Sequence, residues 1–131
     1  MGRRNDGQPT PAELEILQVL WDRGWSTVRE VHELMPDKGS TTVLKFMQIM
    51  TDKGLLEKDD SVRPQRFRAV QSRRDTQRGL LSDLVERVFR GSTGALVLQA
   101  LPLQETTAEE RAEIRRLLDA MESDGDTEVR S

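Results

Sequence analysis

The chain has 131 residues and a formal net charge of −3, with 33% charged and only 4% aromatic residues. It has no cysteine and a single histidine, His32, which excludes disulfides, zinc–thiolate sites, thiol nucleophiles and histidine-based metal sites or triads. No apolar run approaches the roughly 20 residues of a membrane span, and residues 1–8 are polar. We therefore expect a cytoplasmic protein without membrane insertion, catalytic site, metal or cofactor.

Charge is divided unevenly along the chain. Residues 1–74 hold 13 Lys and Arg against 11 Asp and Glu, whereas residues 75–131 hold 7 against 12. The small positive excess therefore lies in the first half. It permits contact with a polyanion there but does not by itself indicate one.

Helix starts are marked by capping boxes, in which a threonine is followed three residues later by a glutamate. The boxes begin at Thr10, Thr27 and Thr107. The predicted helices span residues 11–23, 28–35, 41–53, 73–90 and 108–121, and an apolar segment spans 93–101. The residues predicted to face inward on the first two helices are Leu14, Leu17, Leu20 and Trp21, then Val28, Val31, Leu34 and Met35.

Two short runs of strand character, 55–58 and 66–70, flank a loop at 59–65. Upstream, Trp25 and Ser26 are too few for more than an isolated bridge. Helix, turn, helix and then hairpin is the order of a winged helix-turn-helix, in which a helix enters the DNA major groove and a loop contacts the adjacent backbone. The expected fold class is mainly α with a small β-hairpin: a winged helix-turn-helix followed by a helical dimerisation region.

The helix at 41–53 has two contrasting faces. At 100° per residue, Thr41, Lys45, Gln48 and Asp52 fall on one face, opposite Val43, Met47 and Met50. Hydroxyl, ammonium and amide groups match the edges of bases, and a helix N-terminus can also donate to phosphate. The predicted DNA-binding residues of this helix are Ser40, Thr41, Thr42, Lys45 and Gln48. An ordinary surface helix with a solvated polar face is the alternative.

The loop at 59–65 is the expected wing. Arg63 lies near its tip and Arg66 begins the returning strand, so a guanidinium can reach phosphate or a minor groove. Asp59 and Asp60 would oppose that contact if they point the same way. A solvated hairpin loop is the alternative for this segment.

The C-terminal helices hold many leucines and valines but too few residues for an independent core, so we expect a homodimer. The predicted dimerisation residues are Leu81, Leu84, Val85, Val88, Leu96, Leu98, Leu101, Leu117 and Leu118. The expected domains are a flexible N-terminal arm at 1–9, a winged-helix DNA-binding domain at 10–72, the dimerisation region at 73–123 and a disordered tail at 124–131.

Three stretches carry a resemblance to a known family: TPAELEILQVLWDRGWSTVREVHELM, STTVLKFMQIMTDKGLLEK and VFRGSTGALVLQAL. In these stretches the chain resembles the penicillinase repressor family of bacterial transcriptional regulators. The resemblance implies a winged helix, a C-terminal dimerisation region, and a homodimer that represses promoters through palindromic operators in double-stranded DNA.

The chain departs from that family's pattern at two places. Copper-responsive members end in a cysteine cluster, whereas this chain has no cysteine. Members that respond to β-lactams are cleaved at an Asn-Phe bond by a membrane-bound metalloprotease sensor, and the matching pair here is Gln99-Ala100. Two other functions stay open: a winged-helix module that binds protein, and a ligand-sensing winged-helix regulator of another family.

Overall fold

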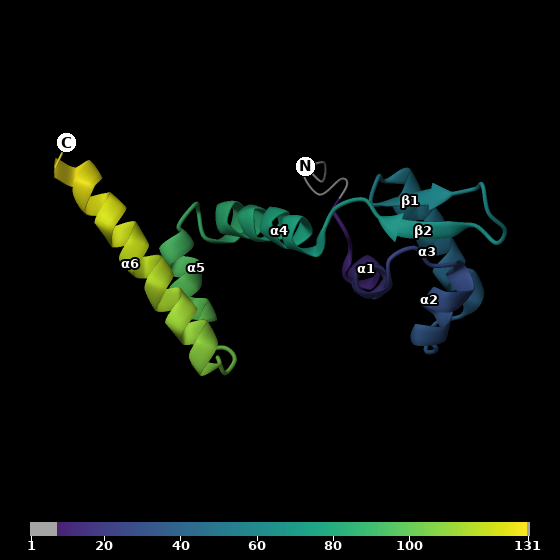
Figure 1. Cartoon of the computed structure of the whole chain (residues 1–131), viewed down its shortest axis with the longest axis horizontal. Coiled ribbons are helices and arrows are strands. Elements are labelled where there is room, and N and C mark those ends of the chain that lie inside the picture. Colours follow the sequence, from purple (N-terminus) through teal and green to yellow (C-terminus); the bar gives the residue numbers. More distant parts are fainter. Residues whose placement is uncertain (1–7, 131) are drawn as a thin grey trace. The chain divides into compact units, whose positions relative to one another are not determined.

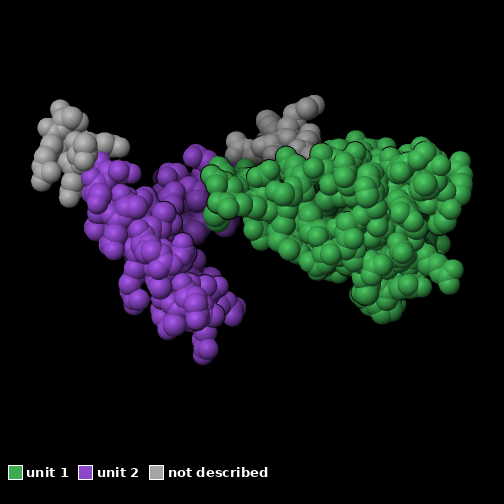
Figure 2. Space-filling model, in the orientation of Figure 1, with its two compact units in different colours: residues 1–83 green, residues 84–131 purple. Residues whose placement is uncertain are grey.

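The computed structural model describes residues 8–130, with side chains described as far as residue 124. The chain is mainly helical with one two-stranded antiparallel hairpin (Figure 1), which confirms the predicted fold class. It divides into two compact units, one ending at Asp83 and one beginning at Leu84 (Figure 2). Most of the predicted N-terminal arm lies outside the described residues.

The first unit contains the helix-turn-helix and the hairpin. Its elements are α1 (Pro11–Arg23), α2 (Val28–Leu34), α3 (Ser40–Asp52), β1 (Leu56–Asp59) and β2 (Arg66–Ala69). Each lies within one or two residues of its predicted bounds. The isolated bridge is also present, because the backbone of Ser26 exchanges two hydrogen bonds of 2.9 and 2.8 Å with Phe67.

A single apolar core holds these five elements together. Its buried members are Ile16, Leu17, Leu20, Val31, Met35, Val43, Met47, Met50, Leu56 and Phe67. Since α3 contributes its fully buried side through Val43, Met47 and Met50, the opposite side of α3 must face outward. Core packing therefore sets the orientation of the polar face.

One predicted inward residue is corrected by the structure, and two others lie at the edge of the buried side. The buried side of α1 is centred on Ile16, Leu17 and Leu20; Trp21 lies about 95° and Leu14 about 115° from that centre, and both are partly buried and pack against the core. Leu34 is 52% exposed because it lies at the edge of the short face that buries Val31. Apolar residue type alone did not separate the centre of a stripe from its edge.

Trp21 connects α1 to the start of α4 (Arg73–Val88). Its indole N–H donates to the carbonyl of Gln71 at 2.9 Å, and the Arg73 guanidinium lies 5.5 Å from the ring centroid. Arg73 also pairs with Asp22 at 2.7 Å. These contacts hold the start of α4 against the end of α1, and Thr76 in the first turn of α4 is buried.

Glu13 is the one buried acid among the described residues, at 3% exposure. It completes the capping box with Thr10, accepting that residue's N–H at 2.9 Å, and it pairs with Lys53 Nζ at 2.8 Å. The ammonium compensates the buried carboxylate and joins the start of α1 to the residue that caps the end of α3.

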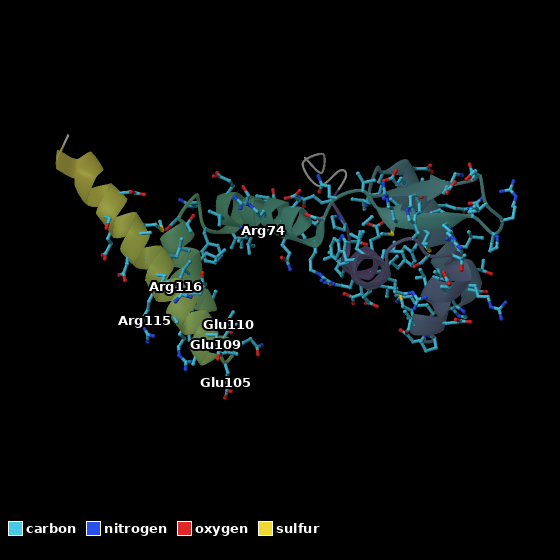
Figure 3. The ribbon with its side chains drawn as sticks, viewed as in Figure 1. Arg74, Glu105, Glu109, Glu110, Arg115 and Arg116 are labelled. Carbon is cyan, nitrogen blue, oxygen red and sulfur yellow. The ribbon has the colours of Figure 1, made fainter. Side chains whose placement is uncertain are left out.

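The second unit contains the end of α4, α5 (Thr93–Ala100) and α6 (Ala108–Arg130). Its described side chains include no buried apolar residue. Glu105, Glu109 and Glu110 gather at the start of α6, and Arg115 and Arg116 follow further along the helix (Figure 3). Acidic side chains at a helix start are favoured by the helix dipole.

The last helix is longer than predicted. It continues to Arg130, whereas the apolar stripe used to predict it ends at Met121. Beyond that stripe the sequence has no periodic apolar signal from which a helix end can be read. Along the described residues, no helix is both long enough and apolar enough to cross a membrane.

The capping box at the start of α2 gives a pH-dependent prediction. The Thr27 N–H donates to Glu30 at 2.9 Å, which holds the pKa of Glu30 below its ordinary value of 4.5. A carboxyl with a lowered pKa stabilises the fold above its ordinary value, and that contribution is lost as the pH falls through the lowered pKa. We expect Glu30→Gln to be less stable than the wild type above pH 4.5, with the difference shrinking as the pH falls below it.

Urea unfolding across this pH range measures the effect, and Thr27→Val provides the matched control. That variant removes the capping hydroxyl but keeps the N–H, so it should cost about 1 kcal/mol and retain most of the pH dependence. Equal stability of Glu30→Gln and the wild type at every pH would contradict the capping role of Glu30.

Candidate nucleic-acid interface

The outer face of α3 is polar and exposed. Thr41, Lys45 and Gln48 are exposed on the side opposite the fully buried Val43 and Met47. The split predicted from helical periodicity is therefore present in the structure. It presents a hydroxyl, an ammonium and an amide along one side of a single helix.

The N-terminus of α3 lacks the side-chain cap found on neighbouring helices. Thr10 and Thr27 cap α1 and α2 through their hydroxyls, whereas Gly39 stands at the N-cap of α3 and makes no side-chain hydrogen bond there. Ser40, Thr41 and Thr42 are all exposed in the first turn. This first turn presents N–H and hydroxyl donors, together with the positive end of the helix dipole.

Asp59, one of the two acidic residues of the wing, is hydrogen-bonded within the loop. Asp59 accepts the backbone N–H of Ser61 at 2.9 Å and also its hydroxyl, and these hydrogen bonds, the hydroxyl's first, lower the pKa of Asp59. Arg63 is exposed, and its guanidinium donates to the carbonyl of Asp60 at 3.4 Å. The loop thus presents Arg63 to solvent while Asp59 is engaged within the loop.

The two arginines of β2 have different surroundings. Arg68 lies 4.6 Å from the centroid of the Trp25 ring and pairs with Glu57 at 2.8 Å, so it belongs to the outer surface of the hairpin. Arg66 is exposed opposite Asp59, and its charge contributes to lowering the pKa of both Asp59 and Glu30. Only Arg66 was predicted as a DNA-binding residue.

Two hollows flank Gln48, and they bring in residues that the sequence did not single out. One, of about 350 Å³, lies between α3 and the hairpin and is lined by Lys58 and Gln65. Lys58 stands two residues after the buried Leu56 and opposite Phe67 in the register, so it lies on the hairpin face that packs toward α3. The alternation of β1 is the signal that identifies Lys58 once the register is known.

The second hollow, of about 340 Å³, lies on the other side of Gln48. Leu44 of α3, Val28 of α2 and Pro64 of the wing contribute apolar groups to it, and Arg29 lies in its wall. Gln48 is thus the residue of α3 shared by both hollows. Within the described residues, no group of three or more His, Cys, Asp or Glu side chains is arranged to hold a metal.

The residues predicted for dimerisation are mostly uncovered in the single chain. Val85 and Leu96 are half-buried, and the exposed members are Leu81, Leu84, Val88, Leu98, Leu101, Leu117 and Leu118. Gln99 and Ala100, the predicted cleavage pair, are exposed in the last turn of α5. The structure thus leaves a set of large apolar side chains without cover along α4, α5 and α6.

A family model described as penicillinase repressor matches residues 9–120 of the chain. The matched segment covers both the helix-turn-helix with its hairpin and the helices that follow. No curated protein matches the chain.

Proposed function

The chain belongs to the penicillinase repressor family, a family of DNA-binding transcriptional repressors, and we propose that it binds palindromic operator DNA as a homodimer. In this proposal residues 10–72 bind DNA and residues 73–123 form the dimer. The double-stranded operator would be met in the cytoplasm.

The single observation that carries the proposal is the outward polar face of α3 beside the wing. Thr41, Lys45 and Gln48 lie on one exposed side of a helix whose opposite side is locked into the core. An α-helix fits the major groove, where lysine matches guanine and glutamine matches adenine. Arg63, at the exposed wing, would contact the backbone or the minor groove.

Phosphate contacts would fix the register of that helix. The uncapped first turn of α3 offers Ser40 and Thr42 hydroxyls and free N–H groups, the donor set that phosphate oxygens accept. Arg66 and Lys58 add positive charge on the hairpin. The first unit therefore supplies both base-reading and backbone-positioning groups.

Dimerisation through the second unit is supported by its exposed leucines and valines. Large apolar side chains left in water are unfavourable, and a second copy of the same helices is the simplest cover for them. A two-fold dimer also presents two α3 helices, one to each half of a palindrome.

Relief of repression would follow loss of the dimer. A cut at the exposed Gln99-Ala100 bond would separate α6, with its exposed Leu117 and Leu118, from α4. By family resemblance, a membrane-bound metalloprotease sensor would make that cut. Without its partner each winged helix contacts one half-site only.

The direct test is to select genomic fragments with the purified full chain and to read the sequence they share. We expect a two-fold symmetric site of two half-sites. Recovery of fragments without a shared sequence would overturn the proposal of a palindromic operator.

A protein-binding winged helix is favoured by the net charge of −3, and salt dependence separates it from a DNA-binding one. Counterion release gives DNA binding a steep dependence on salt.

We expect Arg63→Ala to weaken operator binding about equally across sequences and to reduce the salt slope by about one.

Arg68→Ala is the matched control in the same hairpin, because Arg68 is engaged with Trp25 and Glu57. It should leave the salt slope unchanged. An identical slope for Arg63→Ala and the wild type would remove Arg63 from the DNA interface.

A further inference from the structure

One apolar side chain interrupts the edge of the polar face of α3. Leu44 is 39% exposed, and it stands three residues after Thr41 and four before Gln48, so it shares their side of the helix. A single exposed leucine is common on a protein surface. Its surroundings distinguish this one, because Leu44 lies in the wall of the hollow next to Gln48.

The lining of that hollow is mostly apolar and includes a few polar groups. Val28 and Pro64 bring apolar groups to it from α2 and the wing, and Phe67 of the core lies in its lining. Arg29 and Gln48 provide a guanidinium and an amide among the lining residues. A mostly apolar lining that also holds an amide and a guanidinium suits a polar ligand edge that carries one small apolar substituent.

The comparison with Ile49 shows that exposure alone does not define the feature. Ile49 is also 39% exposed on α3, but about 140° round the helix from Leu44. It lines neither of the two hollows beside Gln48. The two residues have the same exposure and different surroundings, which makes Ile49 a matched control.

Resting on the proposed function, we infer that Leu44 receives the C5 methyl group of a thymine in each operator half-site. Among the base edges in the major groove, thymine alone presents a methyl group, and apolar side chains contact it. Gln48, four residues further along the same side, has the amide that pairs with adenine N6 and N7. Each half-site should therefore carry a thymine beside the base pair that Gln48 reads.

The test replaces thymines of the selected operator one at a time with deoxyuridine, which removes only the methyl group. Binding is titrated with the full-length wild type and with Leu44→Ala. When the thymine that contacts Leu44 is replaced, the affinity of the wild type should fall about fourfold, which is the affinity gained by burying one methyl-sized group. Leu44→Ala should bind the methylated and unmethylated operators equally well.

Three further variants isolate the contact. Leu44→Met keeps an apolar side chain of similar volume and should keep the deoxyuridine effect. Ile49→Ala, with the same exposure, and Thr41→Ser, which removes the methyl group of the residue three positions before Leu44 on the outer face, should also keep it. Unchanged thermal unfolding checks that each variant is folded.

Several results would overturn the inference while leaving operator binding intact. These are a deoxyuridine effect that persists in full in Leu44→Ala, one that disappears in Thr41→Ser, or no effect at any thymine in the wild type. If instead the wild type showed no preference for any DNA sequence, the proposed function would fail, and the thymine contact with it.

Discussion

A chain ending at Gln99 should be monomeric at micromolar concentration and should bind the operator at least about a hundredfold more weakly than the full chain. The truncation removes Leu101 and the apolar residues of α6, Leu117, Leu118 and Met121, all of which are exposed in the single chain. Joining two half-site contacts in one particle typically raises affinity by about 10²–10⁴. Losing the dimer removes that gain.

Sedimentation and operator titration measure the two effects together, and a chain ending at Ser123 is the matched control. It removes the polar end of α6 but keeps the apolar residues up to Met121. It should behave like the full chain. If the chain ending at Gln99 dimerised and held the operator as tightly as the full chain, derepression by loss of the C-terminal helices would be excluded.

Replacing Lys45 and Gln48 together with alanine should nearly abolish recognition of the operator. Each residue is expected to contribute about 1–3 kcal/mol to discrimination against a wrong base, so the pair accounts for a loss of about 2–6 kcal/mol. The core should be untouched, because both side chains are exposed and point away from Met47 and Met50. Binding to unrelated DNA should fall much less.

Competition titrations with operator and unrelated DNA separate lost specificity from lost charge. Lys38→Ala is the control for charge, since its ammonium lies 4.0 Å from Glu15 of α1 and is not on the outer face of α3. It should keep operator preference. Unchanged operator affinity in the double alanine variant would make the assignment of α3 as the recognition helix wrong.

The parts of the fold that depend on local chemistry were predictable from the sequence. Thr10 with Glu13 and Thr27 with Glu30 form the expected capping boxes, and both helices begin where those boxes place them. The two faces of α3 followed from a period of 3.6 residues, because Val43, Met47 and Met50 fall on one side of the helix and the polar Thr41, Lys45 and Gln48 fall on the other. Local signals therefore gave the winged helix and its outward face.

Contacts between distant segments were not predictable in the same way. Lys58 lies beside Gln48 only because the hairpin packs against α3, and the hollow that Leu44 lines depends on α2 and the wing. The pairing of Arg68 with Trp25 and Glu57 likewise depends on the register of the hairpin and on the bridge at Ser26. No spacing along the chain encodes these neighbours.

The apolar side chains of the second unit are not covered within one chain. Residue type alone predicts that leucines such as Leu98 and Leu117 are buried, yet they are exposed in the isolated chain. In the proposed dimer these side chains are buried by a second copy of the chain. Neither helical periodicity nor the fold of one chain can therefore predict their burial. The dimerisation residues and the Gln99-Ala100 cut therefore stay predictions.

The most direct measurement for the proposed dimeric repressor compares the selected operator with one in which about five base pairs are inserted at its centre. Such an insertion turns one half-site by about half a helical turn, out of reach of a two-fold dimer that spans one face of the duplex. We predict two chains bound per intact operator and an affinity loss of at least about a hundredfold on the extended one. Equal affinity for both operators would contradict recognition of a palindrome by a dimer.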